Sequence, residues 1–368
     1  MKEIRIGMKI IEKRKEKGMT QEELADYLGI SKPAVSKWES GQSYPDITLL
    51  PVIASYFDIS VDELFDYQPQ LNKQEIRKLY RILSDRFMEV GFDVAYQEWS
   101  VYVKKYSSCW TMLLNMGILL LNNANLASTP ANCEEALKEA IHLFDRIEKC
   151  SDELKIIHQI PILKASAYLM LGQASEVIDL LEGRQEIAMS LEIPLATAYI
   201  MKQENEKAMG LLQGSIFSSI ATILSAYPSL LSLCKDDPDA LDRWVISATK
   251  LIDAYGVGKT HLGTVLPFHL TAAILYLGNN RIDRALDHLE AYAHIVCSPG
   301  IFPLTLHGSI LFDHIDGLIE TLDLGNAAPR SDSAVKQSIK DVVLKQPAFI
   351  SLAENERFKR IVRDIEAL

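Results

Sequence analysis

The sequence predicts an all-α protein, with a small N-terminal domain of five short helices followed by a long array of helical hairpins. Apolar residues recur at the spacing of amphipathic helices through most of the 368 residues, and alternating patterns typical of strands are almost absent. Glycines and capping residues divide the first 66 residues into short segments. With 48% hydrophobic and 24% charged residues, the chain has the composition of a folded protein. Its length of 368 residues predicts two or three domains, or one small domain followed by a long repeat array.

The boundaries of the first five helices follow from local signals. The first helix is expected from about Ile4 to Lys17, before Gly18. The second begins with the capping box Thr20 to Glu23 and ends at Gly29, and the third begins at Ser31, which can cap it, and ends at Gly41. A fourth helix is expected from about Asp46 to Phe57, and the capping box Ser60 to Glu63 opens a short fifth.

The connection between the second and third helices has the length of a helix-turn-helix turn. It consists of Leu28, Gly29, Ile30 and Ser31. In this unit the second of the two helices enters the major groove of DNA. Residues 1–66 are therefore expected to form a DNA-binding domain.

Many positions of residues 4–66 resemble the XRE family, the lambda-repressor-like helix-turn-helix domains. The matching residues are Gly7, Arg14, Gly18, Thr20, Gln21, Leu24, Ala25, Ser31, Val35, Ser36, Trp38, Glu39, Gly41, Pro45, Ala54, Phe57 and Leu64. The matching residues include apolar core positions, glycines at turns and polar positions, so the resemblance does not depend on one kind of residue. It implies a five-helix domain that reads an operator sequence in double-stranded DNA.

The third helix carries the candidate DNA contacts. Val35 and Trp38 face the core, so the free face holds Ser31, Lys32, Pro33, Ala34, Ser36 and Lys37. Lysine suits guanine O6 and N7 or a phosphate, and serine suits a base or the backbone. We expect Ser31, Lys32, Pro33, Ser36 and Lys37 to contact DNA.

The resemblance adds two further roles. It implies that Gln21 binds a phosphate from the start of the second helix, and that Arg14 and Glu39 form an internal salt bridge. Pro33 departs from the glutamine of some phage repressors, so their operator sequence does not carry over.

The charge distribution limits how the chain holds DNA. The net charge is −11, so no global positive field exists to attract a polyanion. Residues 1–19 carry seven basic and three acidic groups, whereas residues 42–66 carry five acids and no base. A monomer is expected to bind weakly, and dimerisation should add a second half-site of a palindromic operator.

After a linker at residues 67–72, residues 73–368 are expected to form a second, helical domain. Two helices broken at Gly91 are expected over residues 73–106, a third from Thr111 to Asn125, and a fourth from Asn132 to Lys149, with Asn132 and Glu135 as its cap.

A loose repeat then follows, in which an aromatic residue and a turn lead into a second apolar helix. The repeat begins at Tyr168, Tyr199 and Tyr276, whose side chains are expected to pack in the core. Its second helices start near Val177, Ala208 and Ala285, separated by 31 and 77 residues, or about one and two periods of a 34-residue hairpin. These segments resemble degenerate tetratricopeptide repeats, which form a solenoid.

A helix-turn-helix head on such a solenoid resembles the RNPP group of peptide-sensing regulators. The resemblance implies a short signalling peptide bound to the solenoid. Asparagine side chains can both donate to and accept from a peptide backbone, so Asn115, Asn122 and Asn123 are candidates. The alternative is an antitoxin or phage-type repressor whose solenoid binds a protein partner.

The sequence contains no complete motif for catalysis or metal binding. Residues 256–260 end like a phosphate-binding loop, but Asp253 stands where the motif needs glycine, and a helical pattern precedes it in place of a strand. The five cysteines include no CxxC pair, and the eight histidines show no zincin spacing. We expect a non-enzyme without cofactor or metal.

Two segments of the sequence indicate whether the protein is exported and whether it spans a membrane. The first twenty residues are too charged for a signal peptide, so we expect a cytoplasmic protein. No charged residue lies between Lys207 and Lys235, but this stretch holds six serines and a proline. We expect a helix buried within the helical stack and not a membrane span.

The solenoid is expected to hold a homodimer together, because the small head uses its apolar residues in its own core. An apolar stripe near the C-terminus comprises Pro347, Ala348, Phe349, Ile350, Leu352, Phe358, Ile361, Val362 and Ile365. It either covers a partner subunit or caps its own solenoid.

Overall fold

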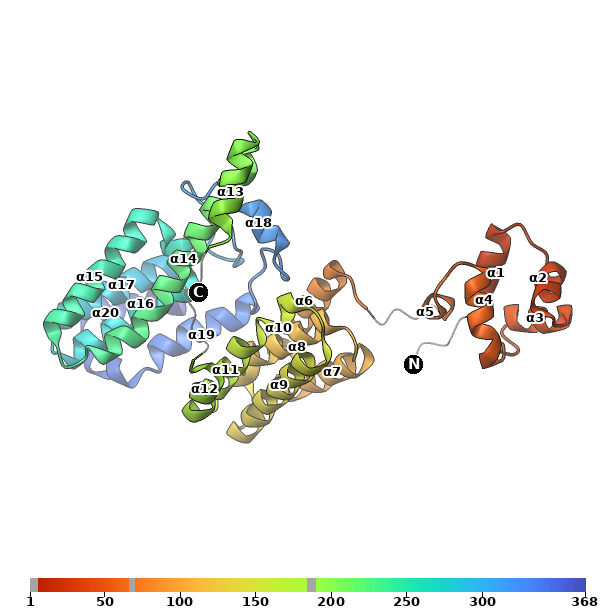
Figure 1. Ribbon diagram of the computed structural model, residues 1–368. Helices are drawn as coiled ribbons and strands as arrows, with labels where there is room; N and C mark the ends of the chain where they lie inside the picture. The colour runs from red at the N-terminus through yellow and green to blue at the C-terminus, as the bar shows by residue number, and fades with distance from the viewer. Residues whose placement is uncertain (1–5, 66–69, 184–189) are drawn as a thin grey trace. The chain divides into compact units, whose positions relative to one another are not determined.

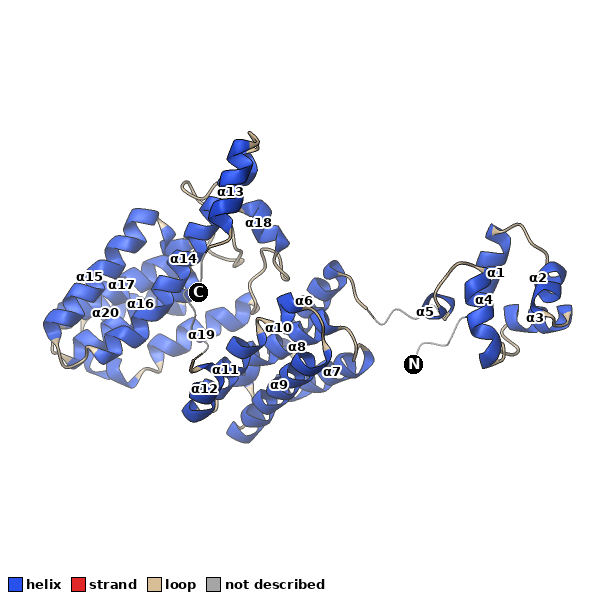
Figure 2. Ribbon diagram, viewed as in Figure 1, coloured by secondary structure: helices blue, strands red, loops and turns tan. Residues whose placement is uncertain are grey.

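A computed structural model describes residues 6–65, 70–183 and 190–368 of the chain (Figure 1). The described residues form helices connected by loops, and none of them lies in a strand (Figure 2). Their one element of β pairing is an isolated bridge between Thr305 and Ala327. The all-α prediction is confirmed.

The N-terminal helices follow the predicted order. They are α1 (Ile6–Glu16), α2 (Gln21–Leu28), α3 (Lys32–Glu39), a 3-10 turn (Ile47–Leu49), α4 (Leu50–Tyr56) and α5 (Val61–Leu64). The expected start at Ile4 and the end of the first domain at residue 66 lie outside the described residues.

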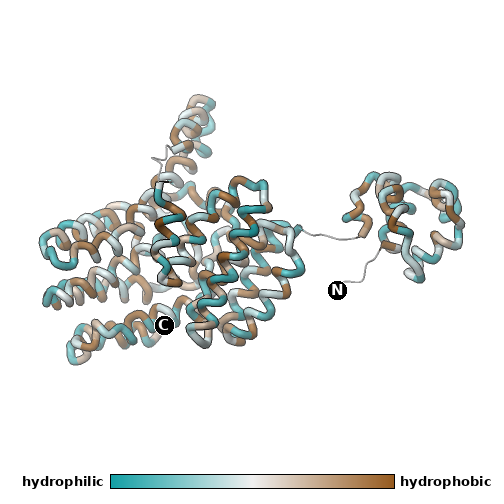
Figure 3. The backbone as a smooth tube through the Cα atoms, turned by 60° about the horizontal axis from the view of Figure 1, so that its bottom comes forward, coloured by the Kyte–Doolittle hydropathy of each residue, from teal (hydrophilic) through white to brown (hydrophobic). Residues whose placement is uncertain are grey.

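The five helices share one apolar core. Its buried members come from every helix and include Ile10, Leu24, Val35, Ile53 and Leu64. Figure 3 shows hydrophobic and hydrophilic positions alternating along these helices, as amphipathic helices around a common core require. This core fixes the orientation of α2 and α3, on which the candidate interface depends.

The first helices after the linker are also regular. They are α6 (Lys73–Glu89), α7 (Phe92–Lys105), α8 (Trp110–Asn123), a 3-10 turn (Ala124–Leu126), α9 (Pro130–Cys150), α10 (Leu154–Ile157), α11 (Ile160–Met170) and α12 (Ala174–Leu181). The break at Gly91 is confirmed, since its φ is +83°.

The predicted cap of α9 at Asn132 is wrong. The helix begins at Pro130, and the Thr129 side chain accepts a hydrogen bond from the Asn132 amide. The Asn132 side chain instead donates to Asp93 over 2.9 Å. Thr129 caps the helix because a proline at its first position needs no amide partner.

The remaining helices complete the second region. They are α13 (Glu192–Met201), α14 (Asn205–Leu233), α15 (Pro238–Tyr255), a 3-10 turn (Val257–Lys259), α16 (Leu262–Gly278), α17 (Ile282–Val296), α18 (Asp316–Thr321), α19 (Asp332–Leu344), a 3-10 turn (Pro347–Leu352) and α20 (Glu356–Glu366).

Three helical hairpins share one turn geometry, and this confirms the predicted repeat. The pairs α11/α12, α13/α14 and α16/α17 each turn through a left-handed residue, which is Gly172, Gln203 or Asn280 with φ of +72°, +62° or +57°. In each turn the amide of the next residue donates over 2.9 Å to the carbonyl of the repeat tyrosine, Tyr168, Tyr199 or Tyr276. Tyr276 is fully buried, whereas Tyr168 and Tyr199 are half-buried.

Helix α14 contains the uncharged stretch, and the expectation that it is buried all round is wrong. The helix spans 29 residues, and by its length and its mean hydropathy of 1.5 it could cross a membrane, but only 22% of its most apolar window is buried. Its buried face includes Ile220, Leu224 and Leu231. On its open side serine and threonine hydroxyls bond to backbone carbonyls of the preceding turn, such as Ser219 to Ser215 over 2.7 Å, so charge is not needed there.

The C-terminal apolar stripe caps its own domain. Phe349, Leu352, Phe358, Ile361 and Ile365 are buried in the core that α14 to α17 form. Arg357 fixes α20 to α17 through Glu290, with Nε to Oε1 at 2.8 Å. Of the two alternatives for this stripe, the structure supports the cap.

The chain divides into two compact units. The first comprises Met1–Asn72 and Val103–Leu113, and the second comprises Lys73–Tyr102 and Leu114–Leu368. Residues 66–69 of the expected linker lie outside the described residues, and the expected boundaries of 1–66, 67–72 and 73–368 remain predictions.

Candidate nucleic-acid interface

Helices α2 and α3 are set at a fixed angle by local interactions. Thr20 and Glu23 form the predicted capping box at the start of α2. Gly29 ends α2 with φ of +65°, a conformation that side chains with a Cβ rarely adopt. Leu28 and Val35 then pack into the same core, one from each helix. The turn therefore has the predicted helix-turn-helix form.

The outer face of α3 carries the predicted contact residues. Val35 and Trp38 are 0% and 6% exposed and face the core. On the opposite face all five predicted contact residues are exposed: Ser31, Lys32, Pro33, Ser36 and Lys37. The structure thus brings together one surface of two lysines, two hydroxyls and a proline.

Ser31 occupies the N-cap position of α3, but the prediction that its side chain caps the helix is wrong. Its hydroxyl accepts no capping hydrogen bond. Pro33 has no amide hydrogen to offer, and the amide of Ala34 donates to the Ser31 backbone carbonyl over 2.9 Å. The hydroxyl therefore remains available to an outside partner.

The two lysines of this face differ in their surroundings. The Lys32 ammonium lies 3.2 Å from a carboxylate oxygen of Glu22 on α2, and both side chains are well exposed. No ion pair of Lys37 is found in the part of the chain that the structure describes. Lys37 can contact an anion directly, whereas Lys32 must first leave Glu22.

Arg14, Glu39 and Gln21 form a cluster beneath the interface. The Arg14 guanidinium donates to both Glu39 oxygens, with Nε to Oε1 at 2.6 Å and the second contact at 2.9 Å. Arg14 also donates to the Met19 carbonyl over 2.6 Å, so it joins α1 to the start of α2. Burial raises the pKa of Glu39, but the hydrogen bonds from Arg14 and Gln21 outweigh it and hold that pKa below its usual value.

Gln21, the residue expected at a phosphate, belongs to this cluster. Its side-chain amide donates to Glu39 Oε2 over 2.8 Å. Its carbonyl oxygen cannot donate to a phosphate, so a direct phosphate contact requires the amide to leave Glu39 or to share its second hydrogen.

Lys15 is a basic neighbour of this cluster that the sequence did not single out. It is exposed on α1, and its charge contributes to lowering the pKa of Glu39. Its position in the sequence, directly after Arg14, could have indicated that it lies near this cluster. Lys15 therefore adds an exposed positive charge beside the cluster of Arg14, Glu39 and Gln21.

The asparagines proposed for peptide binding all lie on α8. Asn115 and Asn123 are 1% and 0% exposed, and Asn123 donates to the Leu119 carbonyl. Asn122 is half-buried and donates to the Tyr80 hydroxyl over 3.4 Å. In this conformation a peptide cannot reach Asn115 or Asn123.

A hollow of about 510 Å³ lies instead between α13, α14 and α18. Apolar side chains of Leu195, Leu211 and Leu318 line it, together with Glu206 and Lys207. Its size and mixed lining suit a small ligand or a side chain of a peptide.

The segment that resembled a phosphate-binding loop is the end of a helix. Gly256 terminates α15 with φ of +61°, and Val257–Lys259 form a 3-10 turn. A helix precedes this segment, where the phosphate-binding motif requires a strand. Within residues 6–65, 70–183 and 190–368, no group of three or more His, Cys, Asp or Glu side chains is placed to hold a metal ion.

Sequence comparison identifies the N-terminal domain. A helix-turn-helix family model matches residues 10–64. The chain is 35% identical over 81 residues to the HTH-type transcriptional activator BcrR of Enterococcus faecalis, covering 20% of this chain and 40% of BcrR. It is 38% identical over 61 residues to the cryptic phage CTXphi transcriptional repressor RstR of Vibrio cholerae, covering 17% of this chain and 54% of RstR. The chain thus spans about half the length of these relatives or less.

Among solved structures, the chain is similar to Bacillus thuringiensis PlcR in complex with the peptide PapR7 and DNA. The similarity covers 80% of this chain and 96% of PlcR, with 14% identity and a TM-score of 0.31. This likeness is remote and establishes no ligand of this chain. The family match and the geometry of α2 and α3 agree with each other, and residues 10–64 form a helix-turn-helix domain of the XRE type.

Proposed function

We propose that this protein is a cytoplasmic transcriptional regulator that binds a specific sequence of double-stranded DNA through α3. One observation carries the proposal: the exposed face of α3, in a matched helix-turn-helix domain, presents Lys32, Ser36 and Lys37 together. These side chains have the donors that guanine edges and phosphates accept. No catalytic reaction is assigned to the chain.

Each residue of the face has a stated role in this proposal. Lys37 contacts a base edge or a phosphate, and Lys32 does so after releasing Glu22. Ser31 and Ser36 hydrogen-bond to a base or the backbone, and Pro33 packs against it. Gln21 at the start of α2 reaches a phosphate, and Lys15 on α1 contacts the DNA backbone as well.

The regulator acts as a homodimer on two inverted half-sites. The basic surface of one domain is small, and a second half-site adds affinity without new contacts. The dimer forms through the helical region, because large apolar side chains on α13 and α14 remain exposed there, including Ile200, Met209 and Ile216.

The helical region receives the regulatory signal in the form of a short peptide. The hollow between α13, α14 and α18 supports this, since its leucines can hold an apolar side chain while Glu206 and Lys207 bind polar groups at its rim. Asn122, which is half-buried, is a further contact for the peptide. The second candidate is an antitoxin or phage-type repressor, for which the exposed apolar side chains of α13 and α14 bind a protein partner.

Sequencing the DNA bound by the protein in its own cells tests the main proposal. The wild-type chain should enrich a few sites with inverted half-sites, and a chain with Lys32→Ala and Lys37→Ala should lose them. Lys250→Ala removes an exposed lysine on α15 and serves as the control. Equal enrichment by the double variant and the wild type would exclude α3 as the reading helix.

The neighbouring genes separate the two candidates for the helical region. A gene for a small secreted peptide beside this gene supports peptide sensing, and a toxin gene supports the antitoxin. A peptide that signals must also shift operator affinity, because any coupling between two sites is reciprocal.

A further inference from the structure

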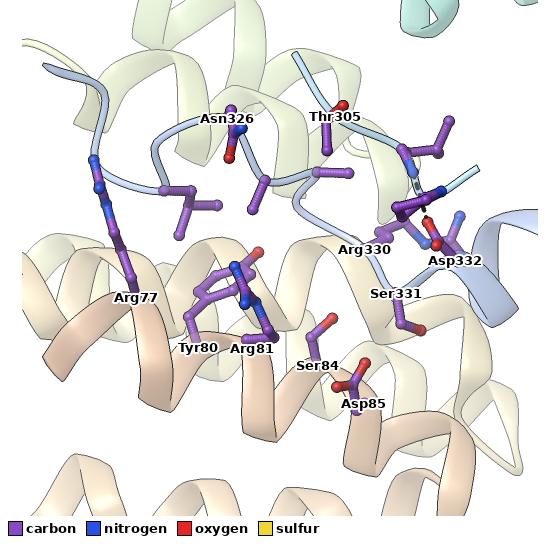
Figure 4. Close-up of a pocket in the computed structure, with 15 residues that line it drawn as sticks. Arg77, Tyr80, Arg81, Ser84, Asp85, Thr305, Asn326, Arg330, Ser331 and Asp332 are labelled. Carbon is purple, nitrogen blue, oxygen red and sulfur yellow. Dashed lines mark hydrogen bonds between the residues drawn. The ribbon is translucent and has the colours of Figure 1, made fainter. Parts of the chain in front are cut away.

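A second hollow, of about 380 Å³, lies between α6 and two stretches of the C-terminal region (Figure 4). Residues 303–305 precede α18, and residues 324–332 connect α18 to α19. The volume is in the range of small-molecule sites. Three arginines and two aspartates line it, namely Arg77, Arg81, Arg330, Asp85 and Asp332.

One wall of this hollow is held in place by α6. The Arg77 guanidinium donates to the backbone carbonyls of Glu320, Leu322 and Asp323 over 2.7 to 2.9 Å. The Tyr80 hydroxyl donates to the Pro329 carbonyl over 2.8 Å. The charge of Arg77 is thus engaged with the connecting segment, and the shape of the hollow is fixed without a ligand.

Two buried polar atoms of the lining have no partner. The Ser84 side chain is 4% exposed, and its hydroxyl makes no hydrogen bond within the described part of the chain. The Nε atom of Arg330 is likewise buried and without a partner among the described residues. A buried donor left unpaired lowers the stability of the fold, and more so when it is charged. Such atoms are rare in native proteins, and their occurrence in one hollow points to a missing acceptor.

Arg81 adds a third donor group. Its guanidinium forms no hydrogen bond in the described ranges, and Figure 4 shows it beside Tyr80 and Ser84 on the same helix. It presents a planar fork of N–H groups, which matches the geometry of carboxylates and phosphates.

Two aspartates share this lining with the three arginines. One oxygen of Asp332 already accepts the Leu304 amide over 2.9 Å. Burial raises the pKa of Asp85, as do the charges of Glu89 and Asp332, whereas the nearby charge of Arg81 lowers it. Arg330 donates from Nη2 to the Ala334 carbonyl over 3.5 Å, and burial lowers its pKa.

We propose that this hollow binds a small organic anion, whose carboxylate or phosphate group accepts hydrogen bonds from Arg81, Arg330 Nε and the Ser84 hydroxyl. The anion supplies the acceptors that both orphaned atoms lack. It bridges α6, the first helix after the DNA-binding domain in the sequence, to the segment before α19. The proposal concerns binding and does not depend on the DNA-binding function.

Thermal unfolding of the full chain tests the proposal, with inorganic phosphate and succinate as the two probes and sodium chloride of equal ionic strength as the reference. At about 10 mM, a concentration that suits a weak fragment-like ligand, at least one probe should raise the Tm above the reference. A rise with phosphate alone assigns a phosphorylated ligand, and a rise with succinate assigns a carboxylate. No rise with either probe overturns the proposal.

Three variants locate the effect. Arg81→Gln, Ser84→Ala and Arg330→Met should each weaken the probe by about tenfold or more, since each removes one donor to a charged acceptor. Lys78→Gln, on the exposed side of α6, is the control and should keep the full rise.

Arg330→Met also separates a binding role from a structural one. If the Arg330 guanidinium serves to bind an anion, its removal should leave the Tm in chloride unchanged or higher. The reason is that the variant no longer buries a charged group whose Nε has no acceptor among the described residues. A lower Tm in chloride, with the anion-dependent rise retained, would show that Arg330 only supports the fold and would overturn the assignment.

Discussion

His269 on α16 and His288 on α17 face each other through their Nδ1 atoms, which lie 2.9 Å apart. Only one proton can occupy this contact, so one neutral ring donates and the other accepts. Phe268 packs edge-on against His288, and Tyr276 stacks on it. Burial lowers the pKa of His269 to about 3, with a further contribution from the charge of His288, and burial lowers the pKa of His288 to about 4.

We therefore predict that α16 and α17 lose stability in mild acid. The unfolded histidines take up protons near pH 6.5, whereas the folded pair resists protonation down to the lowered pKa values. Stability should be fully present above pH 6.5 and decline as the pH falls toward 4. Between pH 7 and 5 the loss should be about 2 kcal/mol for each histidine.

Amide hydrogen exchange of α16 and α17 at pH 7 and pH 5, corrected for the intrinsic rates, measures this loss. His288→Gln should remove part of the pH dependence. His294→Gln, an exposed histidine of the same helix, is the control and should behave like the wild type. A pH-independent opening energy in the wild-type chain would contradict the prediction.

The cluster around Glu39 predicts a stability effect in the N-terminal domain. Glu39→Ala leaves the buried Arg14 guanidinium and the Gln21 amide without their acceptor. The free energy of unfolding should fall by about 3 kcal/mol. Faster hydrogen exchange over residues 6–65 measures it.

The matched control is Glu22→Ala, because its ion pair with Lys32 is exposed and should contribute less than about 1 kcal/mol. Equal protection in both variants would show that the Arg14 pair does not hold the domain.

The surroundings of the two lysines on α3 predict a ranking of their effects on DNA binding. Lys37→Ala should cost about 1 to 3 kcal/mol on the operator if Lys37 reads a base. Lys32→Ala should cost less, because wild-type Lys32 gives up its contact with Glu22 on binding. Titration of operator DNA at several salt concentrations separates a base contact from a phosphate contact, which flattens the salt dependence. The reverse ranking would count against the geometry of this face.

The hairpin turns predict opposite effects of two substitutions. Gly172→Ala places a Cβ at φ +72° and should lower stability by about 1 kcal/mol. Gln203→Gly removes one at φ +62° and should stabilise the chain by a similar or smaller amount. Gly278→Ala is the control, since Gly278 lies in α16 with open space around it. Urea unfolding followed by circular dichroism checks all three.

The proposed dimer predicts how two fragments sediment. Residues 70–368 should sediment as a dimer and residues 1–68 as a monomer, because exposed apolar side chains such as Ile200 and Met209 lie in the helical region. A monomeric 70–368 fragment would refute this assignment.

Local signals in the sequence predicted what local interactions decide. The Thr20 capping box, the turn at Gly29 and the hairpins that begin at Tyr168, Tyr199 and Tyr276 all depend on residues within one or two turns of each other. The outward face of α3 followed equally well from the burial of Val35 and Trp38, because helical geometry fixes which side chains lie opposite.

Side-chain partners from other elements could not be predicted in this way. The contact of Gln21 with Glu39 and the burial of Asn115 depend on how helices pack, and a polar residue type alone is compatible with a surface or a core position. The openness of α14 was missed because serine and threonine hydroxyls bonded to their own helix need neither charge nor burial. The hollow beside α6 brings together residues that lie some 240 positions apart in the sequence, as the contacts of Arg77 do. No sequence spacing predicts such a site.

The turns at Gly172, Gln203 and Asn280 close on hydrogen bonds within their own hairpins. Each hairpin therefore specifies its own shape before any neighbour arrives, and the array can begin to fold at more than one place along the chain. During synthesis, the pair α11/α12 can close while α16 is still inside the ribosome. A lineage can also add or lose a whole hairpin without changing the next turn, so the surface of this region can diversify while the helix-turn-helix domain stays unchanged.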